Sequence, residues 1–80
     1  MKVNRAIAMR ISKLLRERKM SQYRLEMKSG VLHGTLSGIM YEKSKNVGIN
    51  NLILIAQGFG MSIKDFFDDP LFNNENLEIE

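Results

Sequence analysis

The apolar positions at the start of the chain recur with the period of an α-helix. Successive members of the set are four, four, three and one residues apart, which keeps them on one face of a helix with 3.6 residues per turn. The pattern predicts a first helix from about Asn4 to Arg18. Its apolar members are Val3, Ile7, Ile11, Leu14 and Leu15.

Two short helices are predicted next, on either side of Gly30. Ser21 is a favourable N-cap, and Leu25 gives the segment that follows a buried side. Glycine adopts the left-handed backbone that ends a helix without a steric penalty, so this helix is expected to stop at Gly30. Val31 begins a second apolar set, which predicts another helix from about His33 to Tyr41. Two short helices joined in this way form the outline of a helix-turn-helix.

The segment from Ile49 to Phe59 is almost wholly apolar. It predicts a fourth helix at the centre of the core, capped at or just before Asn50 and ending near Gly58 or Gly60.

A short fifth helix is expected after Ser62. Ser62 and Asp65 have the spacing of a capping box in its acidic variant, and Pro70 ends the helix because the residue before a proline disfavours helical backbone. The buried face of this helix is expected to consist of Ile63, Phe66 and Phe67.

Together these signals predict an all-α fold, a compact five-helix domain with a helix-turn-helix formed by its second and third helices. The domain is expected to cover residues 3–69, and the acidic tail of residues 70–80 is expected to fray. The alternation of Leu77 and Ile79 with glutamate leaves a second possibility, a strand that pairs in a dimer. Eighty residues leave no room for another domain.

Charge is divided between the two parts of the chain. Residues 1–45 hold eleven Lys/Arg against three Glu, a net charge of +8, whereas residues 46–80 hold one Lys against six acids, a net charge of −5. Lys and Arg that neutralise phosphates drive nonspecific binding to nucleic acid, so one surface is expected to face a polyanion. The alternative is an ordinary solvated basic helix face.

Several kinds of chemistry are disfavoured. The chain has no cysteine and a single histidine, His33, so no metal and no cofactor are expected. Asp65, Asp68 and Asp69 lack the spacing and turn glycine of a calcium loop, and no nucleophile with a base suggests an enzyme. The apolar run from Leu52 to Ala56 is far shorter than the ~20 residues that span a bilayer. We therefore expect a cytoplasmic protein without membrane association.

The order of the signals over residues 4–68 resembles the Cro and phage-repressor type (XRE-like) helix-turn-helix family. This order is a first helix, Ser21-Gln22, Leu25, Gly30-Val31, Leu36 and Ile39, a loop with Lys43 and Lys45, an apolar helix, and Phe66-Phe67. The resemblance implies a sequence-specific transcriptional regulator of double-stranded DNA, a repressor, whose helix from His33 to Tyr41 lies in the major groove.

The resemblance also assigns the DNA contacts. The residues expected to touch base edges are His33, Gly34, Ser37 and Gly38. The residues expected to touch the DNA backbone are Ser21, Gln22, Thr35, Tyr41, Lys43 and Lys45. The free amides and dipole of a helix N-terminus favour the binding of phosphate, which supports the assignment of Ser21 and Gln22. The alternatives are that Ser21 is only a cap, that the lysines are only solvated and that His33 is merely exposed.

Four positions in the helix-turn-helix are unusual. Glycine inside a helix costs roughly 1 kcal/mol relative to alanine, so Gly34 and Gly38 indicate close approach to DNA, a loosely specified readout or neutral drift. Glu26 stands where the family commonly has alanine, so its carboxylate is expected to point outward or to strain the turn. Leu32 stands at the usual Ser/Thr cap of the reading helix and removes a phosphate-binding hydroxyl.

Operators of this family are usually read by two-fold dimers on half-sites about 34 Å apart, which predicts a homodimer. The basic face is expected to include Arg10, Lys13, Lys28, Lys43 and Lys45. The alternative function is a protein-interaction module of the same fold, such as an antitoxin or a regulator's partner, because Leu32, Gly34 and Gly38 weaken the reading helix.

Overall fold

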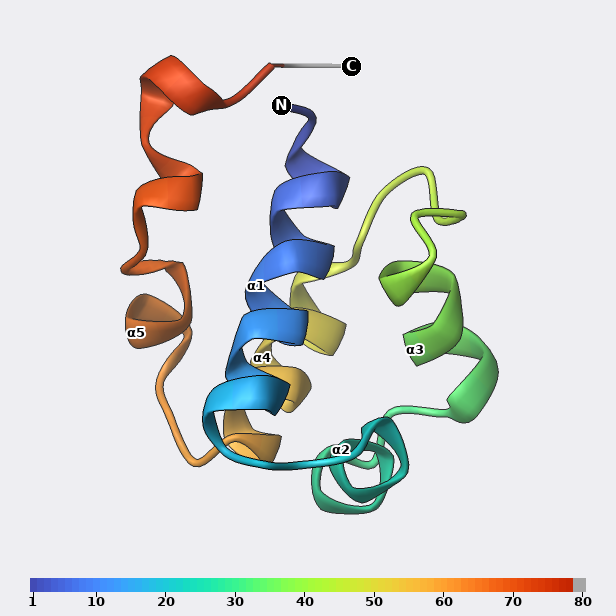
Figure 1. The fold of residues 1–80 in the computed structure, drawn as a ribbon. Coiled ribbons are helices and arrows are strands. Elements are labelled where there is room, and N and C mark those ends of the chain that lie inside the picture. The colour runs from blue at the N-terminus through green and yellow to red at the C-terminus, as the bar shows by residue number, and fades with distance from the viewer. Residues whose placement is uncertain (79–80) are drawn as a thin grey trace.

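The computed structural model describes residues 1–78 and confirms the all-α fold. Five α-helices are followed by two short 3₁₀ turns (Figure 1). The α-helices are α1 (Val3–Glu17), α2 (Gln22–Ser29), α3 (His33–Met40), α4 (Ile49–Gly58) and α5 (Ile63–Phe67), and the 3₁₀ turns are η1 (Pro70–Phe72) and η2 (Asn74–Asn76). No helix in this part of the chain is long and apolar enough to cross a membrane.

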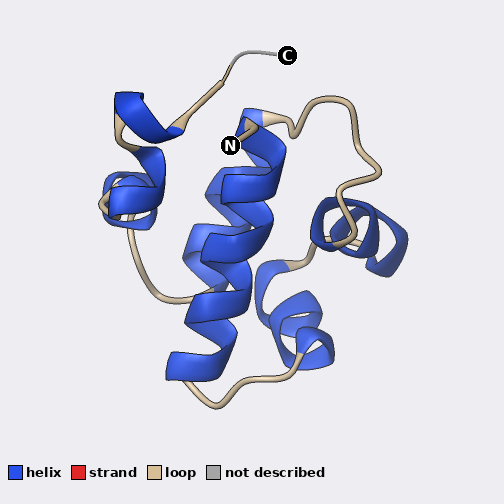
Figure 2. Ribbon diagram, turned by 45° about the horizontal axis from the view of Figure 1, so that its top comes forward, coloured by secondary structure: helices blue, strands red, loops and turns tan. Residues whose placement is uncertain are grey.

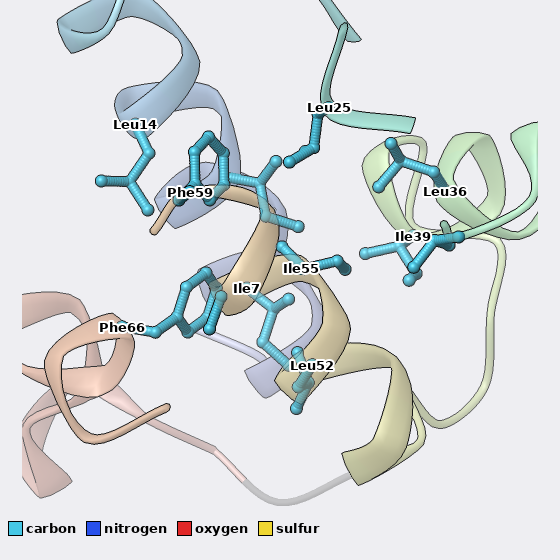
Figure 3. Close-up of a cluster of buried hydrophobic side chains, with 12 residues drawn as sticks. Ile7, Leu14, Leu25, Leu36, Ile39, Leu52, Ile55, Phe59 and Phe66 are labelled. Carbon is cyan, nitrogen blue, oxygen red and sulfur yellow. The ribbon is translucent and has the colours of Figure 1, made fainter. Parts of the chain in front are cut away.

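The helices α1 and α4 occupy the middle of both views, where α4 lies behind α1, with α5 on one side and the α2–α3 pair on the other (Figures 1 and 2). Every α-helix contributes to the single buried cluster between them. The labelled side chains in Figure 3 are Ile7, Leu14, Leu25, Leu36, Ile39, Leu52, Ile55, Phe59 and Phe66. Burial of one such side chain stabilises the fold by roughly 1.5–3 kcal/mol. Because Leu25, Leu36 and Ile39 belong to this cluster, the same core that stabilises the other helices also stabilises the helix-turn-helix.

The helix α4 is central but not buried on all sides. Leu52, Ile55 and Ala56 face the core, whereas Ile49, Ile53 and Leu54 are 58%, 36% and 37% exposed. The prediction of a central core helix is therefore confirmed for one side only, and an apolar strip of α4 remains at the surface.

The contact between α2 and α4 is too close for a side chain at Gly58. A Cβ atom there would lie 2.9 Å from Ser29 Cβ and 3.0 Å from Leu25 Cδ1. Ser29 is itself buried, and its Oγ accepts a hydrogen bond from the Val31 N–H at 3.1 Å. One small residue on each helix thus seats α2 against the core and helps to fix the turn into α3.

The expectation of a frayed tail is wrong for residues 70–78. Asp69 Oδ1 accepts a hydrogen bond from the Leu71 N–H at 3.0 Å, which caps η1. The Phe72 ring lies edge-on against Phe67, with centroids 4.8 Å apart. Apolar residues spaced among the acids anchor this segment to the core.

The end of the described chain meets its beginning. The Glu78 N–H donates to the Met1 carbonyl at 2.8 Å, and an isolated parallel bridge joins Lys2 to Glu78. This pairing is within one chain. The proposed dimer strand included Ile79, which lies outside the described residues.

Arg10 does not belong to an exposed basic face, contrary to the sequence-based expectation. Its side chain is 8% exposed and crosses from α1 to the end of α5. Its Nε donates to the Phe66 carbonyl at 2.7 Å, and its Nη2 donates to the Asp65 carbonyl at 3.0 Å. Its Nη1 lies 3.2 Å from Asp69 Oδ2. The residue fastens the C-terminal part of the fold to α1.

Lys13 shares this role. Its Nζ lies 2.9 Å from Asp69 Oδ2, so its charge is also committed to the fold. Desolvation of Asp69 raises the pKa of its carboxyl, but the hydrogen bonds from the Leu71 N–H and from Lys13, with the charges of Lys13 and Arg10, outweigh it and leave the pKa below its ordinary value. Asp69 is therefore ionised at neutral pH, and the charges of Lys13 and Arg10 balance its negative charge.

Candidate nucleic-acid interface

The turn between α2 and α3 is built as predicted. Ser21 Oγ accepts a hydrogen bond from the Arg24 N–H at 3.1 Å and caps α2. Gly30 has φ 77°, in the left-handed region, and its N–H bonds to the Glu26 carbonyl at 2.9 Å. The chain then enters α3 at Leu32, which caps the helix with no side-chain hydrogen bond.

One side of α3 is fixed in the core by Leu36 and Ile39, and the opposite side is open. His33 and Gly34 are exposed, and Tyr41, which caps the C-terminus, is 72% exposed. The remaining predicted contacts on this helix, Thr35, Ser37 and Gly38, are half-buried. The structure therefore brings His33, Gly34 and Tyr41 to the surface together with part of Ser37.

The two glycines of α3 have different surroundings. A Cβ atom at Gly34 would meet nothing within 4 Å, whereas one at Gly38 would lie 3.2 Å from Ser44 Oγ. The Gly38 carbonyl also accepts hydrogen bonds from the N–H groups of Lys43, at 2.8 Å, and Ser44, at 3.3 Å. A Cβ at position 38 would therefore crowd the hydroxyl of Ser44 in the following loop, while nothing inside the described structure requires glycine at position 34.

A polar network links α2 to α3 at the surface. Gln22 Nε2 donates to Ser37 Oγ at 3.0 Å and to Glu26 Oε2 at 3.2 Å. The same Glu26 oxygen lies 2.7 Å from His33 Nδ1. The predicted contact residues Gln22, His33 and Ser37 are therefore preorganised by one another and by Glu26, a residue that the sequence-based prediction of DNA contacts did not include.

Glu26 neither points into solvent nor strains the turn, which corrects the sequence-based expectation. Its side chain is 12% exposed and is covered by its partners. The hydrogen bond from His33 lowers the pKa of Glu26, desolvation opposes this, and the hydrogen bond from Gln22 adds to the lowering. The carboxylate is therefore ionised and accepts hydrogen bonds across the helix-turn-helix.

The side-chain amide of Gln22 already uses both of its hydrogens within the protein. The main-chain N–H groups of Gln22 and Tyr23 are better placed to donate to an anion at this end of α2, because the first amides of a helix have no acceptor in the preceding turn. Arg24 N–H is taken by the cap.

The backbone of the loop between α3 and α4 is tied to α1 by hydrogen bonds. Asn4 Nδ2 on α1 donates to the carbonyls of Ser44, at 2.7 Å, and Lys45, at 2.8 Å. These bonds hold the backbone of the loop while the side chains of Lys43 and Lys45 remain exposed.

A hollow between this loop and the start of α1 contains two cations that the prediction of backbone contacts left out, Lys2 and Arg5. They line it together with Lys43 and Lys45, and the acids Glu42 and Glu78 are also present. Arg5 is exposed on α1, and only the fold shows that it adjoins the loop.

A second group of cations surrounds the start of α2. Arg18, Lys19, Arg24 and Lys28 line a hollow beside Ser21. In Figure 1 the α1–α2 connection runs below α3, and the α3–α4 loop lies above it. Positive charge therefore stands on both sides of α3, an arrangement that suits two parallel runs of anionic groups.

The comparison with protein families agrees with this geometry. A family model described as the Cro/C1-type HTH DNA-binding domain matches residues 10–70, from the middle of α1 to the first residue of η1. The fold and interface define a DNA-binding helix-turn-helix protein. The chain belongs to the Cro/C1-type HTH DNA-binding domain family, whose partner is double-stranded DNA. No curated protein and no solved structure matches the chain.

Proposed function

We propose that the chain is a sequence-specific transcriptional regulator that acts as a repressor from the cytoplasm, by binding and not by catalysis. Residues 3–69 form the DNA-binding part. The observation that carries the proposal is the arrangement of α3, which is anchored in the core by Leu36 and Ile39 and offers His33 and Gly34 to the outside. A helix presented in this way fits the major groove.

The proposed base contacts are His33, Gly34 and Ser37, with Gly38 acting through its packing against the loop. Tyr41 belongs at the edge of the same contact, because it lines one hollow with His33 and Ser37. The proposed phosphate contacts are Ser21, the N-terminal amides of α2 at Gln22 and Tyr23, Thr35, Lys43, Lys45, Lys2 and Arg5.

Selection of duplexes from a random pool, followed by binding measurements over a range of salt concentrations, tests the function. We expect one enriched sequence and a log K that falls linearly with log salt, with a slope of about −0.9 for each phosphate neutralised. Absence of binding to every duplex at low salt rejects the proposal. Enrichment of no sequence, with salt-dependent binding retained, rejects sequence specificity alone.

We further propose a homodimer, because one helix-turn-helix offers a small interface and operators are usually read as two half-sites. The exposed isoleucines of α4, Ile49 and Ile53, support a self-contact on that helix, since burial of apolar surface stabilises an interface. Sedimentation of the wild type and of Ile53→Lys tests this assignment. A monomer at all concentrations contradicts the dimer, and an equally stable Ile53→Lys dimer moves the interface elsewhere.

A protein-interaction module of the same fold, such as an antitoxin or a regulator's partner, remains the second candidate. The observation that favours it is the exposure of Tyr23, Met27 and Leu32, at 69%, 66% and 76%, on α2 and the turn into α3. Exposed apolar side chains of this size commonly mark protein contacts. If this candidate is right, Met27→Asp abolishes partner binding while salt-dependent DNA binding is weak or absent in the wild type.

A further inference from the structure

The contact between Glu26 and His33 orients the one histidine of the interface. Glu26 Oε2 lies 2.7 Å from His33 Nδ1, the carboxylate side chain is 12% exposed and the imidazole side chain is 75% exposed. The carboxylate thus sits against the protein, and the ring stands between it and solvent. Glu26 is held in turn by Gln22 Nε2 at 3.2 Å, so the ring is aligned by a fixed partner.

This arrangement determines which nitrogen of the ring is free. An ionised carboxylate can only accept hydrogen bonds, so Nδ1 must carry the hydrogen between them. The remaining nitrogen, Nε2, has Ser37 Oγ as a neighbour at 3.4 Å, a long and weak contact. Nε2 is therefore an acceptor when the ring is neutral and a donor when the ring is protonated.

The surroundings of the ring contain one group of fixed charge. The hollow around His33 is lined from α2 by Gln22, Tyr23 and Glu26, and from α3 and its end by Ser37 and Tyr41. The two tyrosines contribute phenol hydroxyls, which can donate and accept hydrogen bonds. The lowered pKa of Glu26 keeps its carboxylate ionised over the range, about pH 5 to 8, in which histidine ordinarily changes charge.

We propose that Glu26 is a specificity-positioning residue of the DNA interface, which holds His33 so that Nε2 faces the base edge and changes its hydrogen-bonding sense with ring protonation. The inference rests on the proposed function. The neutral ring accepts a hydrogen bond from the amino group of adenine or cytosine, and the protonated ring donates to N7 or O6 of guanine. The base preferred by His33 therefore depends on pH, and Glu26 determines that dependence.

The test compares base preference at about pH 8 and about pH 5.5, using the full chain and duplexes that differ at one base pair. At each base pair of the selected half-site, the ratio of affinities for guanine and for adenine or cytosine is measured at both pH values. For the wild type we expect one position at which this ratio changes by roughly fivefold or more, the effect of one hydrogen bond gained or lost. The other positions serve as internal controls, because a change in overall charge acts on all duplexes alike.

Three variants separate positioning from a structural role. Glu26→Gln retains an oxygen acceptor for the Nδ1–H but not the charge, so it should keep the preference at pH 8 and lose most of the change at pH 5.5. Glu26→Ala should lose the preference at both pH values. His33→Gln, which does not titrate, should show a preference that is independent of pH. Thermal melts followed by circular dichroism establish that each variant is folded.

A measurement without DNA gives independent evidence. In ¹⁵N NMR spectra of the free protein, recorded at a pH where the spectra show a neutral ring, His33 should carry its hydrogen on Nδ1 in the wild type and in Glu26→Gln, and should lose this preference in Glu26→Ala. An Nε2–H ring in the wild type, or the same base preference in all variants, overturns the inference while the proposed function stands. Failure of the wild type to bind any duplex at low salt overturns both.

Discussion

The guanidinium of Arg10 and the carboxylate of Asp69 meet 3.2 Å apart, and the two side chains are only 8% and 5% exposed. They join the middle of α1 to the residue just before η1, 59 positions away along the chain. The pair fastens the C-terminal part of the fold to α1. That part, from α5 onward, lies on the opposite side of α1 from the helix-turn-helix (Figures 1 and 2).

Arg10→Met should destabilise the protein by about 3 kcal/mol, because it leaves the carboxylate of Asp69 buried with one cation fewer. Urea unfolding measures the change. Arg16→Met, an exposed substitution on the same helix, is the matched control and should change stability by less than about 0.5 kcal/mol. Equal stability of the two variants would show that the buried pair contributes nothing.

Stability should fall in acid through Asp69. The pKa of its carboxyl in the folded protein is below the ordinary value of 3.8, so the unfolded chain binds this proton more tightly than the folded one does. The contribution is therefore complete above about pH 3.8 and is lost as the pH falls through the lower, folded pKa. The free energy of unfolding of Asp69→Asn should depend less steeply on pH below 3.8 than that of the wild type, and parallel curves would contradict this role.

Gly58→Ala should destabilise the fold although alanine is the better helix former. Its Cβ would lie 2.9 Å from Ser29 Cβ, and an overpacked core costs about 1–3 kcal/mol, more than the gain of at most about 1 kcal/mol in helix propensity. Chemical denaturation should place its stability below that of the wild type. A midpoint equal to or above the wild type would mean that α2 and α4 separate easily.

Gly34→Ala should have opposite effects on folding and on binding. Nothing lies within 4 Å of the added Cβ, so α3 should gain up to about 1 kcal/mol of stability. If the backbone at Gly34 approaches a base or a phosphate, affinity for the selected duplex should fall at the same time. Unchanged affinity would leave Gly34 without a role in DNA contact.

The cations beside the α3–α4 loop should act on all DNA sequences alike. Lys45→Met and Arg5→Met should each reduce the salt slope of binding by about 1, because each removes one phosphate contact. Lys64→Met on α5 removes the same charge away from the proposed interface and is expected to leave the slope unchanged. A similar reduction of the salt slope in all three variants would indicate a general effect of net charge instead of specific phosphate contacts.

The elements that were predicted correctly are those with local signals. The N-cap at Ser21, the left-handed Gly30 and the apolar stripe of α1 all depend on neighbours a few residues away. Each can be read from spacing and from backbone preference, and each was found where the sequence placed it.

Arg10 was misassigned because its partner is distant in sequence. In the α1 pattern it occupies a polar position, and its burial depends on the carbonyls of Asp65 and Phe66 more than fifty residues away. The anchoring of Phe72 was missed for a similar reason, since an isolated aromatic among acids has no period. Glu26 was recognised as unusual, but only the fold shows that His33 and Gln22 turn it into part of the interface.

The contact of Gly58 with Ser29 also bears on how this protein can vary. Any enlargement at position 58 must be matched by a loss of volume at position 29 or at Leu25, because the two helices leave no gap between them. In a library randomised at both sites, surviving clones should show correlated sizes rather than independent ones. Two positions 29 residues apart in the chain would then covary in side-chain size.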